Sequence, residues 1–200
     1  MKSRWITLVL CLVVVAILVV RLRPPGSKRA LNSANRSQPS SANVYLGLRN
    51  LVLQGTRANF GLGPGSRPTQ PFAVVVDQGP PEGATTVIAI ADGSASVYRS
   101  NGASSIGGGQ SHESIRQAAL KTVQVADEVQ PLMHPATEFP LAQRGEISFY
   151  AVTDAGVYTA TASVDDLASG RSPFSKLGDS AKAIVAAYGE AETKKTNSNP

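Results

Sequence analysis

Residues 104–111 are the segment whose residue types come nearest to a binding or catalytic site. Three consecutive glycines, Gly107, Gly108 and Gly109, precede Ser111 at the expected start of a helix. Backbone N–H groups at a helix N-terminus can hold an anion, and glycines allow a ligand to approach closely. The same glycines lack the Gly-Lys-Ser/Thr of a P-loop and the G-x-G-x-x-G spacing. We therefore treat these four residues as candidates for a small-anion site, and favour a tight structural connection as the simpler interpretation.

His112 follows Ser111 directly and could serve as the base of a Ser/His hydrolase. Such an enzyme also needs a serine nucleophile and an orienting acid. The serines and acids that could supply these groups are Ser104, Ser105, Ser111, Asp92 and Glu113. No G-x-S-x-G nucleophile elbow occurs, and an adjacent Ser-His pair at a helix start is typical of a cap beside an exposed side chain. We expect no catalytic residues and no enzymatic activity.

Metal ligands and disulfides are scarce in this chain. The only histidines are His112 and His134, and the only cysteine is Cys11. Transition-metal sites need clustered His, Cys, Asp or Glu side chains, so we expect neither a metal nor another cofactor. A single cysteine also excludes an internal disulfide.

The net charge of +5 is concentrated at the N-terminus. Residues 1–42 contain seven Lys and Arg and no acidic residue, so residues 43–200 have a net charge of −2. A nucleic-acid-binding domain would present a basic face. The charge distribution therefore excludes nucleic acid as a partner of the domain.

Residues 5–22 predict a single membrane-spanning anchor behind a basic tail, residues 1–4. Between Trp5 and Val20 the only polar side chain is that of Thr7, and a helix of that length spans about 24 Å of a hydrocarbon core of about 30 Å. Flanking arginines can extend to the headgroups. The basic, proline-rich exit at residues 21–25 is a poor cleavage site, so we expect the anchor to remain. Basic residues flank both ends, and the side of the membrane on which the domain lies stays open.

A Pro-, Ser- and Asn-rich linker is predicted at residues 23–42, a globular domain at 43–189 and a disordered polar tail at 190–200. Gly189 is the expected end of the last helix. Apolar periodicity predicts helices over 44–54, 111–129 and 177–188, and a short turn capped by Ser163. Strands are expected at 72–76, 84–91, 94–99, 147–153 and 157–162.

The predicted fold class is α+β: one antiparallel five-stranded sheet with about three helices, in the order α-β-β-β-α-β-β-α. Over residues 43–189 this order resembles that of profilin-like sheets such as roadblock or longin modules. The resemblance lies in element order alone, with no shared motif, and implies a fold rather than a function.

These observations favour a membrane-anchored, non-catalytic domain that binds a protein partner through a sheet edge or a helical face. The membrane is the second partner, through residues 5–22. The first alternative is a domain that senses a small anionic ligand at loop 107–111. A Ser/His hydrolase is the second alternative.

Overall fold

The computed structural model describes residues 41–80 and 83–197. The predicted basic tail, the anchor at residues 5–22 and nearly all of the linker at residues 23–42 lie outside these described residues. Within residues 41–80 and 83–197, no helix is long and apolar enough to cross a membrane. The first described helix begins at Ser41, slightly before the predicted domain start at residue 43.

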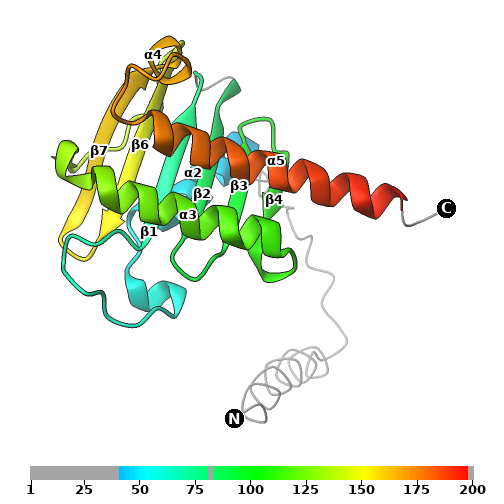
Figure 1. Ribbon diagram of the computed structural model, residues 1–200, viewed down its shortest axis with the longest axis horizontal. Coiled ribbons are helices and arrows are strands. Elements are labelled where there is room, and N and C mark those ends of the chain that lie inside the picture. Colours follow the sequence, from blue (N-terminus) through cyan, green and yellow to red (C-terminus); the bar gives the residue numbers. More distant parts are fainter. Residues whose placement is uncertain (1–40, 81–82, 198–200) are drawn as a thin grey trace, which may run out of the picture. The chain divides into compact units, whose positions relative to one another are not determined.

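A seven-stranded antiparallel sheet forms the middle layer of the domain (Figure 1). Its strand order is β4-β3-β2-β1-β6-β7-β5, so β1 lies at the centre between β2 and β6. The strands are β1 (Ala73–Gln78), β2 (Thr85–Ile90), β3 (Ala95–Arg99), β4 (Ser104–Ile106), β5 (His134–Ala136), β6 (Glu146–Thr153) and β7 (Gly156–Ser163).

The five predicted strands are confirmed as β1, β2, β3, β6 and β7, but the predicted count of five is wrong. The two missed strands, β4 and β5, form the two edges of the sheet. Each has three residues, and each pairs with only one neighbour. Pro135 within β5 is tolerated because an edge strand needs hydrogen bonds on one side only. Short, polar edge strands carry little apolar alternation, which is why the sequence pattern did not show them.

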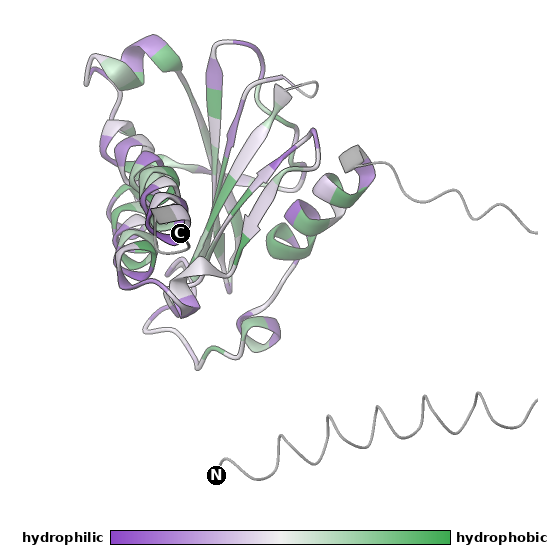
Figure 2. Cartoon of the chain, turned by 90° about the vertical axis from the view of Figure 1, so that its right-hand side faces the viewer, coloured by the Kyte–Doolittle hydropathy of each residue, from purple (hydrophilic) through white to green (hydrophobic). Residues whose placement is uncertain are grey.

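Helices cover both faces of the sheet (Figure 2). Helices α3 and α5 lie side by side on one face, and α2 lies on the other. The α-helices are α2 (Ser41–Leu53), α3 (Glu113–Val129), α4 (Val164–Ala168) and α5 (Ser175–Asn197). Three short 3-10 helices are η1 (Arg57–Phe60), η3 (Gly108–Gln110) and η4 (Gln130–Leu132). The described residues thus contain four α-helices, where the sequence predicted about three.

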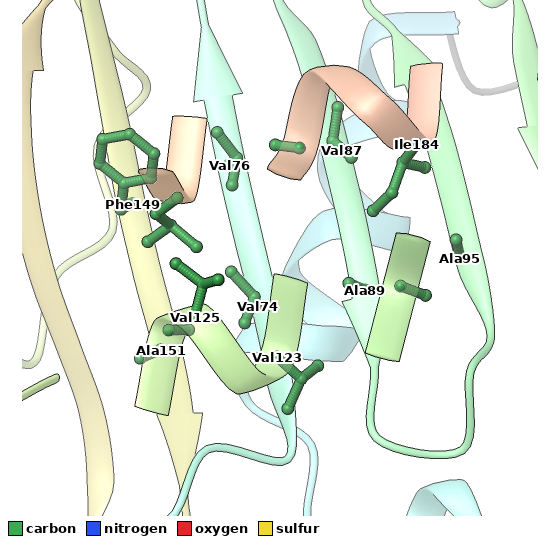
Figure 3. Close-up of a cluster of buried hydrophobic side chains, with 14 of the residues drawn as sticks. Val74, Val76, Val87, Ala89, Ala95, Val123, Val125, Phe149, Ala151 and Ile184 are labelled. Atoms are coloured by element: carbon green, nitrogen blue, oxygen red, sulfur yellow. The ribbon is translucent and has the colours of Figure 1, made fainter. Parts of the chain in front are cut away.

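The larger core lies between the sheet and the pair α3 and α5 (Figure 3). Val74 and Val76 of β1 and Val87 of β2 meet Val125 of α3 and Ile184 of α5. The second core fills the space between the sheet and α2, where Tyr45, Phe72, Val75, Ile88 and Tyr150 are buried. Both faces of β1 and β2 are therefore covered, which confirms the interpretation of their nearly continuous apolar sequences.

The helix ends differ from the sequence prediction at two places. Helix α3 starts at Glu113 with His112 as its N-cap, so Ser111 does not cap it as predicted. Helix α5 continues through Gly189 to Asn197, so the predicted disordered tail is helical up to that residue. Ala, Glu and Lys in this stretch have high helix propensity, which outweighs the single glycine. The cap of α4 is confirmed, because the Ser163 hydroxyl accepts a hydrogen bond from the Asp166 N–H.

Candidate functional site

Strand β4 leaves one side of its backbone unpaired. The Gly107 N–H donates to the Ala95 carbonyl at 3.0 Å, and hydrogen-bonded positions alternate along an antiparallel ladder. With Val97 opposite Ser105, the N–H and C=O groups of Ser104 and Ile106 therefore point away from β3. No other described residue bonds to these outward groups. β4 thus presents a free sheet edge.

Helix α5 extends beyond this edge and forms a roof over it (Figure 1). Beneath the roof lies a cavity of about 680 Å³, which we call the β4 cleft. Ser105 and Ile106 of β4 line one side of it, and Tyr188 and Ala191 of α5 line the other. The extra length of α5 past the predicted helix end at Gly189 is what creates this roof.

The opposite face of the β4 edge is apolar. Val44, Leu48, Tyr98 and Ser104 line a smaller hollow of about 250 Å³ between α2 and the β3–β4 hairpin, and the exposed Arg99 also borders it. Ile106 has 62% of its surface exposed, and Val44 has 47% exposed. Exposed apolar side chains beside a free edge are typical of an interaction surface.

The α5 side of the cleft is predominantly basic. Two lysines, Lys194 and Lys195, line it, against the single carboxylate of Glu192. That carboxylate accepts a hydrogen bond from the Ser105 hydroxyl at 3.5 Å. The two faces of the β4 edge therefore differ in chemistry, with cations on the α5 side and apolar groups on the α2 side.

Three of the four anion-site candidates, Gly107, Gly108 and Ser111, line the β4 cleft, and their N–H groups donate to acceptors within the protein. The Gly108 N–H donates to the Tyr188 hydroxyl at 2.8 Å, and that hydroxyl donates to the Ala95 carbonyl at 2.6 Å. Burial raises the pKa of the Tyr188 phenol. The Ser111 N–H donates to the Gly108 carbonyl at 3.1 Å. Gly107 donates to β3, as described above.

Close packing accounts for two of the three glycines. A Cβ on Gly109 would lie 1.9 Å from the Gly93 carbonyl oxygen, and one on Gly108 would lie 2.5 Å from the Tyr188 ring. Gly107 has a φ of 69°, a conformation that favours glycine. The triple glycine therefore lets the loop pass between the β2–β3 turn and α5.

The residues considered for a hydrolase are partly brought together. Asp92, Ser111, His112 and Glu113 all line a shallow cavity of about 360 Å³. Each acid has another partner: Asp92 accepts from the Ser94 N–H at 2.7 Å and Glu113 accepts from the Gln117 amide at 2.6 Å. Within the described part of the chain, no hydrogen bond joins His112 to a serine. His134 lies on β5, at the other edge of the sheet.

No known relative identifies the chain. No family model matches it, and no curated protein and no solved structure matches it either. Among the residues that the structure describes, no group of three or more His, Cys, Asp and Glu could hold a metal ion. The functional conclusion therefore rests on the geometry of the β4 edge.

A buried polar cluster connects α2 to the sheet on the apolar side of this edge. The Arg49 Nε donates to Asp77 Oδ2 at 2.8 Å, and the Thr86 hydroxyl donates to the other carboxylate oxygen. The hydroxyl groups of Tyr45 and Thr86 are 2.8 Å apart. Burial raises the pKa of the Asp77 carboxyl despite the opposing effect of Arg49. With Arg49 and Asp77 almost completely buried, the cluster is closed to ligands and positions α2.

Sequence reasoning missed both this cluster and the free edge. Arg49 is the only charged residue in the helix at 41–53, and it falls on the same stripe as Tyr45 and Val52. A lone charge on the buried face of a helix indicates a buried partner, so this signal was present. The free edge had no comparable signal, because it depends on which strands become neighbours.

Proposed function

We propose that this chain is a membrane-tethered, non-catalytic domain that binds an extended segment of a partner protein as an added strand on β4. The observation that carries the proposal is the unpaired backbone of Ser104 and Ile106 beneath the α5 roof. In strand addition, main-chain hydrogen bonds supply affinity and side-chain pockets supply specificity. The β4 edge offers both kinds of contact.

The contrast between the two sheet edges supports this proposal. Proteins commonly protect free edges with proline or charged residues, which discourage pairing with another chain. Edge strand β5 contains Pro135, which has no N–H to donate. Edge strand β4 contains neither proline nor charge, and its Ile106 is exposed. Only the β4 edge therefore has the properties of a pairing surface.

The predicted anchor would keep this surface near the membrane. The Pro-, Ser- and Asn-rich composition of the predicted linker, residues 23–42, is that of a segment which would tether the domain to the anchor. A partner in the same membrane would then meet the domain at a raised effective concentration. In support of this tether, the chain has no acidic residue before Asp77, so nothing near the anchor repels anionic headgroups.

The anion-sensing alternative is a weaker fit to the same surface. Lys194 could attract an anion, but the loop N–H groups named above donate to acceptors within the protein. A hydrolase would need the Ser111, His112 and Asp92 side chains to rearrange. Neither alternative uses the free edge of β4.

The proposal is tested with the full chain in lipid nanodiscs and a phage-displayed library of random short peptides. We expect enriched peptides to bind the chain and to protect the amides of Ser104 and Ile106 from hydrogen exchange. Ile106→Asp should abolish binding, and Leu132→Asp, which replaces a 54%-exposed leucine outside the β4 edge, should not. Absence of enriched peptides, or equal binding to both variants, would contradict strand addition at β4.

Carbonate washing of cell membranes tests the tether separately. The full chain should stay in the membrane fraction, and a chain lacking residues 1–40 should be released. Release of the full chain would show that residues 5–22 do not form an anchor.

A further inference from the structure

Resting on the proposed strand addition, we infer that the bound segment belongs to another protein and alternates acidic with apolar residues. Successive side chains of a β-strand point to opposite faces of the sheet. A strand added to β4 would therefore place every second side chain beneath α5 and the others beside α2. Because the two faces of the β4 edge differ in chemistry, the side chains that point to one face should differ in type from those that point to the other.

The α5 side of the cleft favours acidic side chains on the added strand. Ser105 points to this side, because its hydroxyl contacts Glu192 of α5. Lys194 is exposed and, within the described residues, has no ion pair. Lys195 lines the same cleft, where the one carboxylate is that of Glu192. An added strand with carboxylates on this side would meet an excess of positive charge.

The α2 side of the edge favours apolar side chains on the added strand. Ser104 lies on this side, where it shares a hollow with Val44, Leu48 and Tyr98. Ile106 lies two positions along from Ser104, so strand alternation turns its side chain toward this face, while the residue also borders the β4 cleft on the α5 side. No charged side chain of α2 is exposed, because its only charged residue, Arg49, is buried. Arg99 of β3 is the charged residue that borders this hollow. Valine or a similar residue of the added strand, placed opposite Ser104, would cover the exposed Val44.

Two other occupants fit this charge pattern less well. The chain's own predicted linker, residues 23–42, carries Arg23, Lys28, Arg29 and Arg36 and no acid, so the lysines on the α5 side would repel it. A second copy pairing through β4 would offer only Ser-Ser-Ile. It would also bring a second set of α5 lysines to the same edge. Charge complementarity therefore favours a different, acidic protein.

The test uses three fluorescent peptides of equal length that alternate valine with glutamate, serine or lysine. Each is titrated by anisotropy against the full chain in nanodiscs of uncharged lipid. We expect the glutamate peptide to bind about tenfold more tightly than the serine peptide, and the lysine peptide most weakly, with the differences shrinking as salt screens the charges. The double variant Lys194→Glu/Lys195→Glu should invert this order. Lys182→Glu, on an exposed α5 lysine paired with Asp179, is the matched control and should not.

The outcomes separate this inference from the proposed function. Equal binding of all three peptides, with loss in Ile106→Asp, would overturn the acidic partner and leave strand addition standing. No binding of any peptide to the folded chain would overturn both. Self-association of the chain that Ile106→Asp abolishes would identify a second copy as the occupant and overturn the inference.

Discussion

Arg49 and Asp77 form an ion pair between α2 and β1, with Arg49 Nη2 and Asp77 Oδ2 2.6 Å apart and side chains 2% and 0% exposed. The guanidinium also donates to the Pro140 carbonyl at 3.3 Å and lies 5.2 Å from the centre of the Tyr150 ring. The pair thus holds α2 in register on the central strand. Because Val44 and Leu48 of α2 line the hollow beside β4, this register also positions the apolar side of the proposed binding edge.

Arg49→Met should destabilise the domain by about 3–5 kcal/mol, because it leaves the Asp77 carboxyl buried without its cation. The free energy of unfolding is measured by chemical denaturation. Arg67→Met is the matched control, since its ion pair with Asp127 is partly exposed, with side chains 46% and 27% accessible. The control should change stability by less than about 1 kcal/mol. Similar losses in the two variants would show that the buried pair does not hold α2.

Gly109→Ala should destabilise the domain by at least about 2 kcal/mol, because its Cβ would overlap backbone that cannot rotate away. The contact is with the Gly93 carbonyl oxygen, at 1.9 Å. Gly189→Ala provides the control: this glycine lies within α5, and a Cβ there would meet nothing within 4 Å. Replacing it should stabilise the domain by about 0.5–1 kcal/mol. Thermal unfolding of both variants measures these changes in stability. If Gly109→Ala left the stability unchanged, the loop would not pass against the β2–β3 turn.

The fold class was predictable because its signals are local. The turn at Asp92-Gly93 joins β2 to β3, and Asp154-Ala155-Gly156 joins β6 to β7, as their residue types indicate. The α3 helix ends at Val129, before Pro131 as expected. Strands β4 and β5 form because a neighbouring strand offers them hydrogen bonds. A stretch of three residues is too short for its own sequence to reveal that pairing.

The candidate site was predictable only in part, for the same physical reason. Residues 104–111 were singled out, and five of them, Ser105–Gly108 and Ser111, line the β4 cleft. The sequence had suggested an anion site built from the glycine N–H groups, however, whereas the structure indicates that the strand edge beside the glycines is the binding surface. Seeing that edge required two non-local facts: that β4 ends the sheet, and that α5 continues past Gly189 to cover it.

Asp166→Asn should remove part of the acid sensitivity of the domain. Hydrogen bonds from the Ser163 hydroxyl and from Arg171 lower the pKa of the Asp166 carboxyl. A lowered folded-state pKa contributes stability above the usual aspartate pKa of about 4, and this contribution is lost as the pH falls through the lowered value. The stability difference between wild type and variant should therefore shrink on acidification. Asp165→Asn, at an exposed neighbour, is the control, and an equal pH dependence of the two variants would contradict the assignment.

Tyr188→Phe should destabilise the domain by about 1–3 kcal/mol, because the Gly108 N–H and the Ala95 carbonyl both lose their hydrogen-bond partner. Burial raises the pKa of the wild-type phenol, so the folded state keeps this proton after the unfolded state has lost it. The stability that it contributes is therefore present at neutral pH and is lost as the pH rises above about 10. Denaturation curves should show that the difference in unfolding free energy between wild type and Tyr188→Phe is smaller at alkaline pH than at neutral pH. Tyr158→Phe, at a half-buried tyrosine of β7, is the control and should change the stability little at either pH.

The same Tyr188→Phe variant separates stability from binding. Its ring remains as a wall of the β4 cleft, and strand addition uses the backbone of Ser104 and Ile106 rather than this hydroxyl. At a temperature where the variant is folded, peptide affinity should therefore equal that of wild type. A folded Tyr188→Phe chain that no longer binds would mean that the partner contacts the hydroxyl itself, and the binding site would then lie at the glycine loop rather than along β4.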